Sequence, residues 1–178
     1  MENEVCENCQ LDGLDIEENG AVCRLKTQKD ICEVQNHQGH WVHLGFGEIT
    51  IDSAADESCW PLDYGGAFQV TASKRNLRLK AANGADMAHA GEKEVTFKDA
   101  ESGTVLGMTF QVTEVKKALA AVWRLTEKGN VVQFGPGLDQ NFILNVQSGK
   151  KIMLHRRGGS YVMKVEYVKW TPVFQGQA

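Results

Sequence analysis

The side chain best placed to do chemistry is the carboxylate of the segment Asp52-Ser53-Ala54-Ala55. It directly follows residues 47–51 (GEITI), whose β-branched residues predict a strand. Small residues at a strand end predict a tight loop that lifts the carboxylate out of the core and lets backbone N–H groups approach it. A carboxylate held in this way can act as a general acid or base. The four residues alone are more typical of a plain turn than of a catalytic site, so the surrounding elements must decide.

Those elements are mostly strands. The expected strands are residues 77–82, 94–98, 105–115, 131–134, 142–146, 151–155 and 161–168. Asn83-Gly84 predicts a hairpin turn after the first of them. One helix is expected over residues 116–128 (KKALAAVWRLTEK), with Gly129 just past its end. The pattern predicts an all-β fold with one short helix.

Composition indicates one ordinary globular domain with extra sequence. The chain has 178 residues, of which 42% are hydrophobic and 24% charged. It divides into an acidic, cysteine-containing leader (1–44), a central domain (45–135), a C-terminal β-strand extension (136–172) and a frayed tail (173–178). The net charge of −4 gives no reason to expect nucleic acid as a partner.

Neither a membrane span nor a signal peptide is expected, since no apolar run approaches the ~20 residues that a span needs and the first residues are acidic. We therefore expect a cytoplasmic protein with reduced cysteines. Cys6 and Cys9 have the spacing of a zinc knuckle, and Cys23 and Cys32 could complete four ligands. The latter two do not form a second short pair, so chance cysteines are favoured and no metal site is assigned.

The order of strand, Asp-Ser-Ala-Ala-Asp, Asn-Gly hairpin, long strand, helix ending at glycine and final strand resembles the retropepsins, the half-length aspartic proteases of retroviruses and retrotransposons. The resemblance covers roughly residues 46–134, about half of the chain. Residues 159–163 (GSYVM) are similar to an element near the end of copia-type retrotransposon proteases. The fold implied is a single-lobe retropepsin-like β-barrel with one short helix and a C-terminal β-hairpin extension.

The resemblance assigns roles to single residues. Asp52 would be the catalytic aspartate, and Ser53, Ala54 and Ala55 would form the active-site loop. The residues that would bind substrate are Asp56, beside the catalytic pair, and Ala82, Asn83 and Gly84, at the tip of a flap hairpin over residues 80–91. Two carboxylates that share one proton can supply both the acid and the base for peptide hydrolysis. The chain has one such motif, so the second would come from a second copy in a homodimer. A polypeptide substrate and no cofactor are implied.

Ala54 departs from the family, which prefers glycine there, and Ala121 departs in the same way in the late motif. A methyl group at Ala54 can crowd the catalytic pair or its water. Two alternatives to an active protease therefore stay open. One is a catalytically impaired retropepsin-like module for dimerisation or peptide binding. The other is a small zinc-binding protein in which residues 1–44 matter most.

Overall fold

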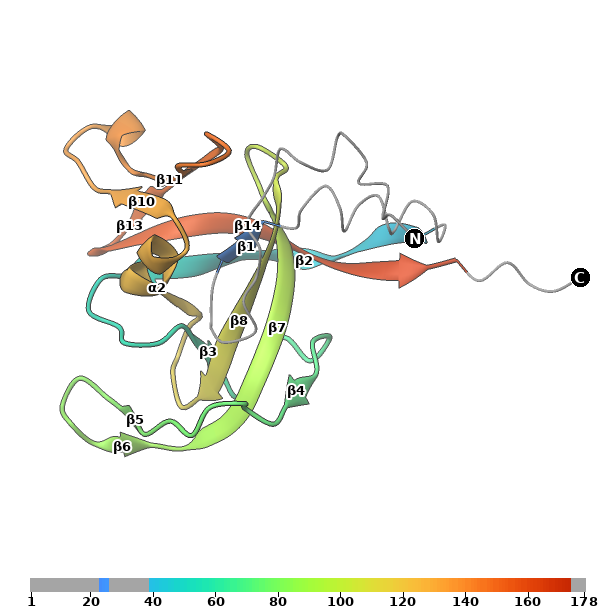
Figure 1. The fold of residues 1–178 in the computed structure, drawn as a ribbon, viewed down its shortest axis with the longest axis vertical. Coiled ribbons are helices and arrows are strands. Elements are labelled where there is room, and N and C mark those ends of the chain that lie inside the picture. The colour runs from blue at the N-terminus through green and yellow to red at the C-terminus, as the bar shows by residue number, and fades with distance from the viewer. Residues whose placement is uncertain (1–22, 26–38, 174–178) are drawn as a thin grey trace, which may run out of the picture.

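A computed structural model describes residues 23–25 and 39–173 of the chain. Within these residues, nine strands form the largest sheet (Figure 1). Eight of them lie in the spatial order β1 (Cys23–Leu25), β8 (Val105–Thr113), β3 (Cys59–Pro61), β9 (Leu119–Ala121), β2 (Gly39–Asp52), β14 (Ser160–Pro172), β7 (His89–Asp99) and β4 (Val70–Thr71). The ninth, β13 (His155–Arg157), pairs with β14. The prediction of a mostly β fold is confirmed.

Two smaller sheets flank the large one. The first contains β10 (Asn130–Gln133), β11 (Phe142–Asn145) and β12 (Lys151–Met153), with a 3₁₀ helix at Leu138–Gln140. The second is a hairpin of β5 (Leu79–Lys80) and β6 (Asp86–Met87). Figure 1 shows the three-stranded unit and the hairpin on opposite sides of α2 (Val122–Glu127).

The core lies between the strands of the large sheet. β7 pairs with both β14 and β8, and β8 pairs with β3, so the sheet path returns on itself. Side chains along β7 alternate between buried and more exposed positions, as strand geometry requires, whereas nearly every position of β8 is buried. Its largest fully buried side chains include Trp60, Phe97, Phe110, Ile49, Leu106 and Met108.

β14 has a different place from the one that the sequence predicts. Residues 136–172 were expected to form an extension beyond a core ending near residue 135. Instead, β14 lies between β2 and β7 inside the large sheet. It pairs with β2 from Tyr161 to Pro172, with a register shift between Tyr167 and Val168. Val162, Met163 and Val165 are buried, and at Val165 the strand pairs with both β2 and β7.

The helix is shorter than residues 116–128. α2 has six residues and is preceded directly by β9. Ala120 and Ala121 are fully buried and pair with the end of β2, so tertiary pairing overrides the helix propensity of the first half of the segment. The predicted end is confirmed: Gly129 has a φ of +78° and donates its N–H to the carbonyl of Thr126 at 3.0 Å.

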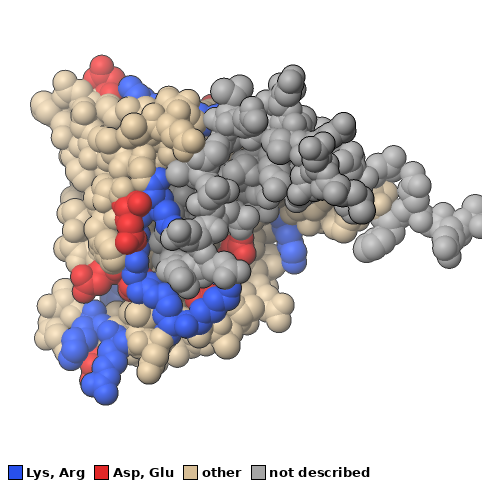
Figure 2. Space-filling model, in the orientation of Figure 1, with Lys and Arg blue, Asp and Glu red and all other residues tan. Residues whose placement is uncertain are grey.

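Charges of both signs mix on the face shown in Figure 2, where blue and red side chains lie next to one another along the described surface. In the part of the chain that the structure describes, no helix is long and apolar enough to cross a membrane.

Candidate functional site

Asp52 lies at the end of β2, beside β9. The two strands run parallel, with Thr50, Ile51 and Asp52 opposite residues 119–121, and Thr50 donates its N–H to the carbonyl of Ala118 at 3.0 Å. Ile51 is buried, whereas Asp52 is half-buried. The predicted strand therefore ends by lifting the carboxylate from the core to the surface.

The loop after Asp52 has the local geometry that the small residues predict. Ala54 donates its backbone N–H to Asp52 Oδ1 at 2.9 Å. The side chains of Ser53, Ala54 and Asp56 are exposed, and Ala55 is half-buried. The carboxylate is thus oriented by its own loop and remains accessible from outside the chain.

The far end of this loop is fixed to β9 and α2. Trp123 Nε1 donates to the carbonyl oxygen of Asp56 at 2.7 Å. Ser58 is fully buried, and its Oγ accepts the backbone N–H of Ala121 at 3.0 Å. These contacts join the two parts of the motif that the resemblance singled out. Asp52 and Ala121 are 69 positions apart in the chain, but tertiary structure places them opposite each other in β2 and β9.

A buried ionic cluster stands directly behind the loop. Glu57 is 8% exposed, and its Oε1 accepts from Arg75 Nη2 and Arg124 Nη2, both at 2.6 Å. Arg75 Nη1 reaches Glu57 Oε2 at 2.9 Å, so this pair is bidentate. Burial opposes the charged form of Arg124, but the hydrogen bonds and charges of Glu57 and Glu127 outweigh it and raise the pKa of the guanidinium. This cluster is not predicted from the sequence, because nothing in the spacing of its members shows that they meet.

Cys59 is a buried free thiol, two residues after Glu57 of this cluster. Burial, and then the negative charges of Glu57 and Asp52, raise the pKa of its thiol to about 11. The thiol is therefore protonated at neutral pH and is not a nucleophile of the site.

The predicted hairpin turn at Ala82, Asn83 and Gly84 is confirmed. Ala81 donates its N–H to the carbonyl of Ala85 at 2.8 Å, and Gly84 has a φ of +83°, which favours glycine. All three tip residues are exposed. Figure 1 shows the β5–β6 hairpin and the loop after β2 extending toward the same side of the molecule.

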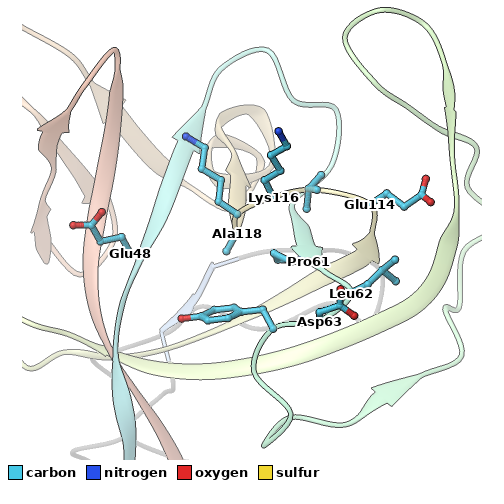
Figure 3. Close-up of a pocket in the computed structure, with 10 residues that line it drawn as sticks. Glu48, Pro61, Leu62, Asp63, Glu114, Lys116 and Ala118 are labelled. Atoms are coloured by element: carbon cyan, nitrogen blue, oxygen red, sulfur yellow. The ribbon is translucent and has the colours of Figure 1, made fainter.

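A pocket of about 690 Å³ lies elsewhere (Figure 3). Its walls are Glu48, Pro61, Leu62, Asp63, Tyr64, Glu114, Val115, Lys116, Lys117 and Ala118. It opens near the beginning of β9, at Ala118, whereas Asp52 stands opposite the end of β9, at Ala121. None of the predicted site residues lines it.

The structure describes no side chain of the four cysteines considered as zinc ligands. Cys6, Cys9 and Cys32 lie outside the described residues, and Cys23 belongs to β1 without a described side chain. Over residues 39–173, no group of three or more His, Cys, Asp or Glu side chains is arranged to hold a metal ion.

Comparison with known proteins gives no relative from which to transfer a function. No protein-family model matches the chain, and searches of curated proteins and of solved structures also found no match.

Proposed function

We propose that this chain is an aspartic endopeptidase of the retropepsin type, folded as a single-lobe β-barrel of retrotransposon origin and active as a homodimer. The observation that carries the proposal is the placement of Asp52. It ends β2 beside the parallel strand β9, which leads directly into α2. Its carboxylate is oriented by the N–H of Ala54 and is accessible at the surface.

In this proposal the two Asp52 carboxylates of a dimer share one proton and a water molecule. One carboxylate accepts a proton from the water as its oxygen attacks the peptide carbonyl carbon, and the other donates its proton to the carbonyl oxygen. The tetrahedral product then collapses: the C–N bond breaks, the nitrogen gains a proton, and an acid and an amine are released. The substrate lies extended under the β5–β6 hairpin, with Asp56 beside its main chain.

Ala54 supports a second candidate, an impaired module that binds peptides or dimerises without cleaving. In the single chain the Ala54 side chain is exposed, so its methyl group has room. Crowding would arise only against the second copy or the shared water. The zinc-binding alternative depends on cysteines outside the described residues. It is tested by metal analysis of the purified protein and by alkylation of Cys6 and Cys9, which free thiols would allow.

The first experiment is a peptide-library cleavage assay from pH 4 to 7 with the wild type, Asp52→Asn and Ala54→Gly. We expect cleavage that is sensitive to pepstatin-type inhibitors, abolished by Asp52→Asn and increased by Ala54→Gly. The sedimentation of each variant measures dimerisation. A dimeric Ala54→Gly protein that cleaves nothing would refute the protease proposal and favour the impaired module.

The second experiment tests whether two chains share the site. Mixing wild type with an equal amount of Asp52→Asn, with time for subunits to exchange, leaves about half of the original wild-type dimers if pairing is random. We expect the activity to fall by the same factor. An unchanged activity in a demonstrated mixture of dimers would mean that one Asp52 suffices.

A further inference from the structure

Gln111 is a buried amide whose contacts the proposed chemistry does not require. It belongs to β8, is fully buried, and lies beside Cys59 of β3 on one side and Glu92 of β7 on the other. Its Oε1 accepts from Ser73 Oγ at 3.1 Å and lies 2.7 Å from His89 Nε2. Its Nε2 has no hydrogen-bond partner. Burying the amide nitrogen without a hydrogen-bond partner costs free energy. The contacts of the amide oxygen must therefore offset this cost.

The two partners of this oxygen stand on the two legs of the β5–β6 hairpin. Ser73 lies in the segment that enters β5, and His89 begins β7, directly after the hairpin. The second leg has a further tie, because Thr113 Oγ1 donates to the carbonyl of Ala88 at 2.5 Å. One buried side chain therefore joins both legs to the large sheet.

Arg75 extends this connection to the loop after Asp52. Its backbone N–H donates to Ser73 Oγ at 3.2 Å, and its guanidinium holds Glu57 in the bidentate pair. The backbone N–H of Gln111 also donates to the carbonyl of Ser58 at 2.8 Å. The hairpin legs and the loop thus rest on the same buried hydrogen-bond network.

We propose that Gln111 is a positioning residue that sets the place of the β5–β6 hairpin relative to Asp52. This inference rests on the proposed function in one respect, namely that the hairpin covers substrate. Loss of the Gln111 oxygen removes an acceptor from Ser73 and His89, both of which are half-buried, and leaves Ser73 only its longer contact to Glu92 Oε2 at 3.3 Å. Each leg therefore loses one tie to the sheet and gains freedom to leave it. The hairpin then holds substrate less well, whereas the chemistry at Asp52 is unchanged.

The hairpin leg can report its own release, because it carries the trypsin sites Arg78 and Lys80. Limited proteolysis at these bonds follows the population of the open form when opening is fast. We compare Gln111→Leu with Asn145→Leu, both in the Asp52→Asn background, which prevents self-cleavage. Asn145 is also a buried amide, but it holds the turn at Ser148 in the three-stranded unit. We expect cleavage at the two sites about tenfold faster in Gln111→Leu than in the control. Equal rates in the two proteins would overturn the inference.

The kinetic measurement uses the chain with Asp52 intact. We expect Gln111→Leu to raise KM about tenfold with kcat nearly unchanged, and Asn145→Leu to alter neither. Faster trypsin cleavage in a protein that hydrolyses no peptide would refute the proposed protease but leave the tie between Gln111 and the hairpin. A loss confined to kcat would refute the positioning role.

Two single-leg variants keep the test decisive if Gln111→Leu does not fold. Ser73→Ala removes the donor of the first leg, and His89→Phe removes that of the second. We expect each to speed trypsin cleavage at Arg78 and Lys80, by less than the loss of Gln111. Rates equal to those of the parent protein in both variants would overturn the inference.

Discussion

Replacement of Glu57 by glutamine is expected to lower the free energy of unfolding by about 3 kcal/mol. The change keeps the size and one acceptor oxygen but removes the negative charge on which two guanidinium groups converge. Removing one partner of a buried ion pair costs about 3–5 kcal/mol, because the remaining charge is buried without compensation.

The structure favours the lower end of that range. The Arg75 side chain is 24% exposed and can turn partly to water. Arg124 is only 9% exposed, but it keeps Glu127 Oε2 at 3.1 Å. Because single domains are stable by only about 5–15 kcal/mol, the loss is a large share of the total.

Urea unfolding at one fixed protein concentration measures the change, and Glu127→Gln is the matched control. Glu127 contacts the same arginine but is half exposed, so its loss should cost no more than about 1 kcal/mol. Adding Arg124→Met to Glu57→Gln should restore part of the stability, because it removes the buried unpaired guanidinium.

A loss below about 1 kcal/mol for Glu57→Gln would refute the reasoning, since it would mean that the cluster is hydrated like a surface pair. A double variant less stable than Glu57→Gln alone would refute the explanation by an uncompensated charge.

Two further predictions use the thiol and the surface charge. Cys59 should resist alkylation in the folded protein at pH 8, and peptide mapping should find it labelled only after unfolding, because its pKa of about 11 keeps it protonated; labelling at the rate of an exposed cysteine would contradict this. Hydrogen bonding from Arg157 lowers the pKa of Glu48, so this carboxylate stabilises the fold above its ordinary pKa and the effect is lost as the pH falls through the lowered value. Glu48→Gln should therefore unfold more easily than wild type at pH 7 and equally easily well below about pH 4; a difference that persists at low pH would contradict the assignment.

The local features of the site could be predicted from the sequence. A β-branched run ending at Asp52, small residues after it, and Asn83-Gly84 between alternating segments each determine nearby backbone. The structure confirms the strand end and the hairpin turn, while the catalytic role of Asp52 stays a prediction. These features depend on contacts within a few residues of the chain.

Features that depend on distant neighbours could not be predicted. The segment before α2 has good helix formers, but burial of Ala120 and Ala121 against β2 makes it a strand. The Glu57 cluster combines side chains 18 and 67 positions apart, and charged residues in a sequence are more often exposed than buried. The same limit explains why Gln111, a polar residue within a long strand, gave no signal.

The position of β14 also constrains how the protein can be made. His43 and Glu166 are bonded at 2.9 Å across β2 and β14, although they are 123 residues apart. During synthesis, β2 leaves the ribosome long before its partner exists, at a rate of about 5–20 residues per second. During that interval one edge of β2 and one edge of β7 lack the β14 strand that pairs with them. Pairing of such distant strands is also intrinsically slow. A nascent chain stopped near residue 135 should therefore depend on chaperones rather than fold, and its release from them should coincide with the emergence of β14.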